Sequence, residues 1–278
     1  MNTQRRTWCI TGISSGLGEA LAQAVLAQGH FLIGTFRDQG QVEWFNQQHG
    51  GRALALRLDL TDADSVAQAA ESIRQHVGRL DVLVNNAGFG FAGAVEEASL
   101  AEVRAVFEAN FFGTLHLTQA LLPLLRAQGQ GRIVQMSSHG GFKAMPGFGI
   151  YNASKFALEG MSEALAAEVA PLGVRVTIVE PGPFRTRFAG AGFREAARRL
   201  PDYDATAGVF RQRIKAVDGQ QEGDPAKAAQ VILHIVAAEN PPLRLPLGKT
   251  AVATLTAKLA SVQHDLDAYR HVAEAAVF

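Results

Sequence analysis

The chain has 278 residues, 47% of them hydrophobic, and its 26 Lys and Arg side chains balance 26 Asp and Glu side chains. This length and apolar content suit a single large soluble domain or two small ones. Because the formal charge is balanced, neither nucleic acid nor an anionic membrane is indicated as a required partner, and a small-molecule function is favoured.

The expected cellular context follows from what the sequence lacks. Its single cysteine, Cys9, excludes a disulfide within the chain. The opening residues, MNTQRRTWCITG, lead into an apolar strand and leave no room for a secretory hydrophobic segment. No apolar run reaches the roughly 18 residues of a membrane helix. A cytoplasmic protein with no membrane partner is therefore expected.

Short apolar runs alternate along the chain with stretches of helical period, which is typical of βα units on a parallel sheet. The runs expected to form strands are 8–11, 30–36, 53–58, 80–85, 131–137 and 174–180, with 243–246 as a further candidate. The pattern predicts an α/β fold with a doubly wound, Rossmann-like parallel sheet in one domain spanning residues 1–278. Ligands of such sheets bind outside the carboxyl ends of the strands.

Helices are predicted between these strands. Residues 17–28 are rich in Ala and Leu, and Ser99 with Glu102 forms a capping box that opens a helix towards Arg126. Asp224 supplies the N-cap of a later helix and is followed by a first-turn proline.

Two later segments depart from the alternation. Residues 183–222 mix Arg, Gly and aromatic residues with only patchy helical period, so we interpret them as an insertion that forms a substrate loop or lid. Residues 247–278 form a C-terminal extension with an amphipathic helix. This extension is expected either to cover the pocket or to meet another subunit.

A glycine-rich turn joins the first predicted strand to the first predicted helix. In WCITGISSGLGEALA, Gly12, Gly16 and Gly18 let the backbone turn sharply and approach a pyrophosphate, which faces the unpaired N–H groups of the helix start. Gly18 also permits tight helix packing. The spacing is GxxxGxG and not GxGxxG, and glycines also punctuate purely structural turns. The turn is interpreted as a dinucleotide site.

The end of the second strand bears on which dinucleotide binds. A NAD site usually offers an acidic side chain there for the ribose hydroxyls, whereas this chain has Arg37. A guanidinium pairs well with a 2′-phosphate, and Ser14 or Ser15 can donate to the same group. NADP is therefore preferred. The adjacent Asp38 keeps NAD open, because a shift of one position would restore an acidic residue.

Tyr151 and Lys155 share one face of a predicted helix because they are four residues apart. An ammonium near a phenol favours the phenolate and lowers the tyrosine pKa from about 10, which makes proton exchange near neutral pH feasible. A half-buried ring beside a solvated amine is the structural alternative. Ser138, at the end of strand 131–137, can orient a substrate oxygen. Ser137 is the competing choice, and both serines can instead satisfy the following turn.

Several motifs in order resemble the short-chain dehydrogenase/reductase family over roughly residues 7–190. They are TGISSGLG at 11–18, Asp59 in LRLDLTD, NNAG at 85–88, Asn110 in EANFFGT, Ser138, YNASK at 151–155, and Pro181–Gly182 followed by Thr186. The combination is far more specific than any single motif. The resemblance implies an oxidoreductase that moves a hydride between a nicotinamide and a ketone or secondary alcohol.

The resemblance also implies roles for individual residues. Tyr151 exchanges a proton with the substrate oxygen, Ser138 orients the carbonyl, Lys155 lowers the tyrosine pKa and binds the nicotinamide ribose, and Asn110 holds a water relay. The expected cofactor contacts are Gly12, Ser14, Ser15, Gly16, Leu17, Gly18, Arg37, Asp59, Leu60, Asn86, Ala87, Gly88, Tyr151, Lys155, Pro181, Gly182 and Thr186. Among them Asp59 is implied to contact the adenine and Thr186 the carboxamide.

Apolar side chains cluster around the candidate site in the sequence. They are Phe89, Phe91, Phe142, Met145, Phe148, Phe184, Phe188, Tyr203 and Phe210. Such a lining suits a bulky apolar ketone or alcohol better than a sugar phosphate, although the same rings also suit a protein core.

Two other functions remain as alternatives. A nucleotide-sugar epimerase or dehydratase also uses YxxxK with a bound nicotinamide, and a nucleotide-sensing protein with this fold has no turnover. The histidines show no HExxH spacing, so no catalytic metal is expected. By analogy with the family, a homodimer or homotetramer is expected through the helices that contain Asn110 and Tyr151.

Overall fold

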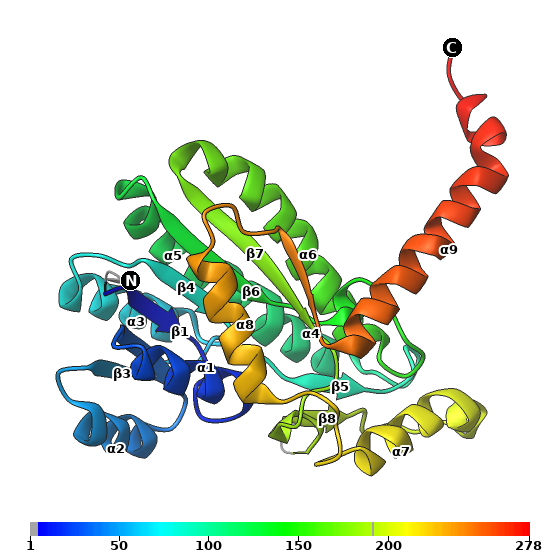
Figure 1. The fold of residues 1–278 in the computed structure, drawn as a ribbon. Helices are drawn as coiled ribbons and strands as arrows, with labels where there is room; N and C mark the ends of the chain where they lie inside the picture. Colours follow the sequence, from blue (N-terminus) through cyan, green and yellow to red (C-terminus); the bar gives the residue numbers. More distant parts are fainter. Residues whose placement is uncertain (1–4, 191) are drawn as a thin grey trace.

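The structure, a computed structural model, describes residues 5–190 and 192–278 (Figure 1). In this described part of the chain, seven parallel strands form a central sheet in the order β3-β2-β1-β4-β6-β7-β9. The strands are β1 (Thr7–Ile10), β2 (Phe31–Phe36), β3 (Ala53–Arg57), β4 (Val82–Asn85), β6 (Gly131–Met136), β7 (Val174–Pro181) and β9 (Arg244–Leu247). Every predicted strand is confirmed, with ends that shift by one or two residues.

Helices cover both faces of this sheet (Figure 1). One hydrophobic core joins the sheet to α1 (Gly16–Ala27), α2 (Gln39–His49) and α8 (Pro225–Ala237), and the other joins it to α3 (Ala63–His76), α5 (Gly113–Ala127) and α6 (Gly149–Val169). Because both faces are covered, β4 is buried at every position. The doubly wound fold is thus confirmed.

The sheet reverses its winding between β1 and β4. From β1 the chain proceeds through β2 to β3 at one edge, and it then returns to build β4, β6, β7 and β9 on the other side. In folds with this strand order, ligands bind at the carboxyl ends of the strands where the winding reverses.

The helix that begins at the Ser99 capping box is interrupted. The Ser99 hydroxyl accepts a hydrogen bond from the Glu102 N–H, and the Glu102 carboxylate accepts one from the Ser99 N–H at 2.8 Å, so the predicted capping box is confirmed. The helix, however, runs as α4 (Leu100–Phe107), a π-helical turn η1 (Glu108–Phe112) and then α5. A π-helical turn contains one residue more than an α-helical turn. The apolar residues recur on both sides of it, so the sequence pattern does not reveal the interruption.

The segment 183–222 folds over the carboxyl end of the sheet with little regular structure. Its strand β8 (Phe193–Glu195) pairs in parallel with β5 (Gly90–Ala92) to form a second, two-stranded sheet. The described residues of this segment also form three short helical turns and α7 (Val209–Ala216). The sequence does not reveal β5 and β8, because strands this short show no alternation and pair with a partner about a hundred residues away.

The C-terminal helix α9 (Lys249–Glu274) touches the domain only with its first turns. Ala251 and Leu255 are buried, and the remainder of the helix extends away from the body (Figure 1). Beyond these first turns, the extension therefore does not lie over the carboxyl end of the sheet. No helix in the described residues combines the length and the apolar composition needed to cross a bilayer.

Candidate active site

The fold brings the four predicted catalytic residues together from three elements. Tyr151 and Lys155 lie in the first turns of α6, Ser138 follows the carboxyl end of β6, and Asn110 lies in the π-helical turn η1. All four side chains are buried. Positions separated by 45 residues in the sequence thus meet at the carboxyl end of the sheet.

Burial sets the protonation of the tyrosine and the lysine. It raises the pKa of Tyr151 above its ordinary value, and a hydrogen bond with Ser138 offsets this only in part. Burial lowers the pKa of Lys155 to about 8, and the nearby Glu159 opposes that shift. The Lys155 ammonium lies 5.9 Å from the Tyr151 ring centroid and donates to the Met136 carbonyl at 2.8 Å.

The raised pKa of Tyr151 contradicts the expectation from the sequence. The i, i+4 spacing predicts a lowered tyrosine pKa, but desolvation of a buried phenolate outweighs the other influences on this group. Tyr151 is consequently a neutral phenol at neutral pH, in which form it can donate a proton to an oxygen that is gaining negative charge.

The two serines after β6 have different partners. The Ser137 hydroxyl donates to Glu159 Oε1 at 2.6 Å, which turns it away from Tyr151. The Ser138 hydroxyl bonds to Tyr151 and also accepts the Gly140 N–H at 3.0 Å. Ser138 therefore both stabilises the turn and lies beside the phenol, whereas Ser137 belongs to another network.

Asn110 connects η1 to the loop after β4. Its side-chain oxygen accepts the Phe89 N–H and its amide donates to the Phe89 carbonyl, both at 3.0 Å. A methyl group built on Gly88 would lie 2.9 Å from Asn110 Oδ1 and 3.7 Å from Lys155 Nζ. A side chain at position 88 would therefore separate these groups, and the π-helical turn is the local distortion that aims Asn110 at this loop.

A buried charge network behind Ser137 was not found from the sequence. Arg244 on β9 pairs with Glu159 of α6, with Glu180 of β7 at 2.9 Å and with Glu163 at 2.8 Å. Burial and the neighbouring Glu159 raise the pKa of Glu180 to about 7. The acidic residues lie on a helix and on a strand distant in sequence, so only the close packing of α6 against β7 brings them to one cation.

Glu180→Gln is expected to change how stability depends on pH. The folded pKa of about 7 exceeds the ordinary value of 4.5, so this carboxyl contributes stability below about pH 4.5 and loses it as pH rises through 7. The slope approaches about 1.4 kcal/mol per pH unit within that window. Urea unfolding at pH 5 and pH 8 should show a larger gain for Glu180→Gln at pH 8.

Glu163→Gln is the matched control, because Glu163 bonds to the same guanidinium but is 61% exposed. It should leave the pH dependence near that of the wild type. Parallel curves of unfolding free energy against pH for Glu180→Gln and the wild type between pH 5 and 8 would contradict the raised pKa of Glu180.

The glycine turn after β1 has the backbone conformation that a dinucleotide cradle requires. Gly12 and Gly16 have φ values of +69° and +66°, which side chains rarely adopt. Asn86 donates from its amide to the Thr11 carbonyl at 2.9 Å and to the Gly12 carbonyl at 3.1 Å, which fixes the turn against the loop after β4.

The start of α1 is open to an anion. Its N-cap residue, Ser15, makes no side-chain capping hydrogen bond, and Ser14 is exposed. A methyl group on Gly16 would lie 3.2 Å from Thr186 Cβ, so the loop after β7 faces the turn directly. A cleft of about 710 Å³ begins at Gly16 and is lined further out by Arg185 and Arg187 and by the carboxylates Glu19, Asp218 and Asp224, so only its Gly16 end suits an anion. These features fit the phosphates of a dinucleotide.

The other expected cofactor contacts also lie at the carboxyl end of the sheet. They are Leu17 and Gly18 in the first turn of α1, Arg37 after β2, Asp59 and Leu60 after β3, Asn86, Ala87 and Gly88 after β4, and Pro181, Gly182 and Thr186 from the end of β7 onward. Asp59 accepts hydrogen bonds from the backbone and hydroxyl of Thr61, which together lower its pKa.

Asp38, the acidic residue that left NAD possible as the cofactor, has a structural role. Asp38 is the N-cap of α2, and its carboxylate accepts the Gln41 N–H at 2.9 Å. Arg37 beside it is exposed at the end of β2. The guanidinium is therefore free to turn towards the cofactor side, whereas the carboxylate is held by the helix.

Aromatic side chains surround Tyr151. Phe148 stacks on its ring at a centroid distance of 4.2 Å, and Phe188 packs edge-on at 5.8 Å. The same cluster contains Phe89, Phe91, Met145, Phe193 and Phe210. The cleft beside α1 does not reach Tyr151, which is only 4% exposed. In this structure the aromatic cluster therefore covers the phenol.

Three of the expected lining residues lie elsewhere. Phe184 packs in the core beneath α8, Phe142 lies under the Arg244 guanidinium, and the Tyr203 hydroxyl donates to Glu96 at 2.6 Å. Phe193, which the sequence did not single out, takes part in the cluster because the β5–β8 pairing carries it over Phe148. Only the tertiary pairing of these short strands could have identified it.

Two further observations concern residues outside this cluster. Within 5–190 and 192–278, no three His, Cys, Asp or Glu side chains converge as metal ligands would. Cys9 is buried in β1, and burial raises the pKa of its thiol to about 12.

Comparisons with known proteins agree with this geometry. The family described as short chain dehydrogenase matches residues 6–196. A 3-ketodihydrosphingosine reductase of Bacteroides thetaiotaomicron is 40% identical over 242 residues, covering 86% of each chain. An NADPH-dependent 3-dehydrocapnine reductase of Ornithobacterium rhinotracheale is 37% identical over 215 residues, covering 75% of each. A crystal structure of a short-chain dehydrogenase from Streptomyces avermitilis, 42% identical, superposes with a TM-score of 0.92 over 99% of this chain and 100% of that one.

The fold and the glycine turn define a dinucleotide-binding α/β oxidoreductase. The chain belongs to the short-chain dehydrogenase/reductase family. It is an NAD(P)-dependent enzyme that acts on small molecules, as the sequence motifs predict.

Proposed function

We propose that this enzyme uses NADPH to reduce a ketone carried by a bulky apolar molecule, with Tyr151 as the general acid. The observation that carries the proposal is the neutral, buried phenol of Tyr151, which bonds to Ser138 inside a cluster of aromatic rings. A neutral phenol donates a proton, which suits the reduction of a carbonyl.

The bound cofactor supplies the hydride, and the protein residues supply position and a proton. Ser138 holds the carbonyl oxygen beside the Tyr151 hydroxyl, which protonates that oxygen as negative charge develops. Lys155, buried behind the phenol and held by the Met136 carbonyl, favours the anionic form that Tyr151 then adopts. Asn110 fixes the Phe89 backbone and so holds the loop that borders the site.

The aromatic cluster supports an apolar substrate. Phe91 and Phe148 are buried, and Phe89, Phe193 and Phe210 are half-buried against them, so the cluster offers apolar contact to a hydrocarbon chain or ring system. The relatives named for 3-ketodihydrosphingosine and 3-dehydrocapnine support a ketone on a larger molecule. A ketodihydrosphingosine is therefore the first substrate to test.

The test measures the loss of NADPH absorbance with a panel of ketones. Each buried methylene contributes about 0.8 kcal/mol, so kcat/KM should rise about tenfold for every two methylenes until the cluster is filled. Small polar ketones should be poor substrates. Efficient turnover of small polar ketones, with none of bulky apolar ones, would refute the substrate class.

Arg37→Ala is expected to weaken NADPH binding about tenfold to a hundredfold and to leave NADH binding nearly unchanged. A charge-assisted hydrogen bond to the 2′-phosphate contributes about 1.5–3 kcal/mol, which corresponds to that range. Fluorescence titration with both cofactors measures the effect. Arg52→Ala, an exposed arginine before the amino end of β3, is the control. Equal losses for the two cofactors would reject the NADP preference.

A further inference from the structure

The outer part of α9 is not covered by any of the described residues. Every residue from 259 to 278 is exposed, and the helix projects from the body of the protein (Figure 1). The projecting stretch up to Glu274 is about 24 Å long at 1.5 Å per residue. An isolated helix of this length is marginal in water, so a partner that covers one face would stabilise it.

That face is a narrow apolar stripe with a regular period. Its members, which we call the α9 seam, are Leu259, Val262, Leu266, Tyr269 and Ala273. Successive members are separated alternately by three and four residues, which is the heptad spacing of a coiled coil. Leu259, Val262, Leu266 and Tyr269 are 48–68% exposed. A seam this narrow fits another helix better than a broad surface.

We propose that the α9 seam pairs with the α9 seam of a second copy of this chain in a parallel two-stranded coiled coil. A stripe that repeats with the heptad period is complementary to itself when two helices are related by a twofold axis. Such pairing covers the apolar side chains that the monomer leaves exposed.

The flanking charges support a second copy in this orientation. With Leu259 and Leu266 at the a positions, Asp265 occupies a g position and Arg270 an e position. In a parallel coiled coil a g residue faces the e residue five positions further along the other helix. Asp265 of each copy therefore faces Arg270 of the other.

The composition of α9 disfavours a membrane as the occupant. Residues 249–274 contain three basic side chains, Lys249, Lys258 and Arg270, and three acidic ones, Asp265, Asp267 and Glu274. A helix that lies on an anionic bilayer carries an excess of Lys and Arg on its polar face. The neutral balance favours a protein partner instead.

The first test is the mass of the full chain in solution, measured by light scattering after size exclusion. The Leu259→Asp/Leu266→Asp variant should have half the mass of the wild type. Ala260→Asp/Ala268→Asp adds the same charge outside the seam and should keep the wild-type mass. Retained NADPH binding shows that the domain is folded in each variant. Identical masses for the wild type and the seam variant would overturn the proposal, as would a monomeric wild type.

The second test addresses the pairing orientation. Asp265→Arg and Arg270→Asp should each weaken association about threefold to tenfold, and the double variant should restore it. Failure of the double variant to restore association would overturn the parallel register. Cosedimentation of the wild type with phosphatidylserine vesicles, lost in the seam variant while the mass stays unchanged, would assign the seam to a membrane and refute self-association. None of these substitutions lies on the helices with Asn110 and Tyr151, so they do not disturb the family-type interface expected there.

Discussion

Replacing Tyr151 with Phe is expected to lower kcat by about 10²- to 10⁴-fold and to leave NADPH affinity within about threefold of the wild-type value. The substitution removes only the hydroxyl that bonds to Ser138 and keeps the ring that stacks on Phe148 at 4.2 Å. The loss should therefore fall on proton transfer and not on folding. Steady-state NADPH oxidation with the best ketone, together with cofactor titration, measures both quantities.

Tyr203→Phe is the matched control for this substitution. It removes the same atom from a tyrosine of segment 183–222 whose hydroxyl donates to Glu96 at the surface. Its kcat should stay within about twofold of the wild type. If Tyr151→Phe kept more than a tenth of wild-type turnover, the proton would come from another group. A protein that only senses the nucleotide would show no turnover to lose.

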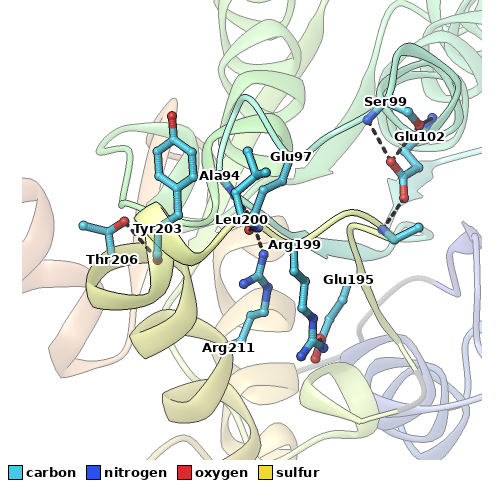
Figure 2. Close-up of polar contacts among 11 residues, drawn as sticks. Ala94, Glu97, Ser99, Glu102, Glu195, Arg199, Leu200, Tyr203, Thr206 and Arg211 are labelled. Carbon is cyan, nitrogen blue, oxygen red and sulfur yellow. Dashed lines mark hydrogen bonds and ion pairs between the residues drawn. The ribbon is translucent and has the colours of Figure 1, made fainter.

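Glu97→Gln is expected to lower the free energy of unfolding by about 3–5 kcal/mol. The Glu97 carboxylate is 1% exposed, pairs with Arg211 of α7, and accepts the N–H groups of Ala94 at 2.8 Å and Leu200 at 3.0 Å (Figure 2). Removing one partner of a buried ion pair leaves the other charge uncompensated, which has this magnitude. Urea unfolding of the wild type and the variant measures the difference.

Glu195→Gln serves as the control for the buried pair. Glu195 binds Arg199 and Lys215, both of which are more than 60% exposed, so its loss should change stability by less than about 1 kcal/mol. A Glu97→Gln effect no larger than this would show that the Arg211 pair contributes little.

The Glu97 contacts also hold the segment that borders Tyr151. They join the start of α7 to the loop after β5. A further hydrogen bond joins the Glu102 carboxylate to the Ala197 N–H at 2.9 Å (Figure 2). In the sequence, Phe188 and Phe193 precede the residues of segment 183–222 that make these contacts. Because loss of these contacts would loosen the aromatic cluster proposed to bind an apolar ketone, we expect Glu97→Gln to raise KM for such a ketone. We also expect it to speed hydrogen exchange over 193–211 before global unfolding. Unchanged hydrogen exchange over 193–211 would show that the Glu97–Arg211 ion pair does not hold this segment in place.

The sequence by itself determined the sheet and the sharp glycine turn after β1. Each strand of the central sheet is a run of apolar residues, and burial on both faces imposes that pattern wherever the strand lies. The motifs around Gly12, Asn86 and Tyr151 are local. Each forms one turn or one face of one helix, and its geometry depends on residues close in sequence. Their positions were therefore predictable to within a residue or two.

Tertiary structure alone decided the electrostatics and the lining of the site. The pKa of Tyr151 rises because the surrounding rings exclude water, and helical spacing contains no information about that burial. Ser137 and Ser138 are neighbours in sequence, yet the packing of α6 against the turn after β6 and against β7 places Ser137 beside Glu159 and Ser138 beside Tyr151. Phe193 joins the cluster through a pairing of β8 with β5. These contacts join residues far apart in the chain, so their energies depend on the whole fold and not on any local pattern.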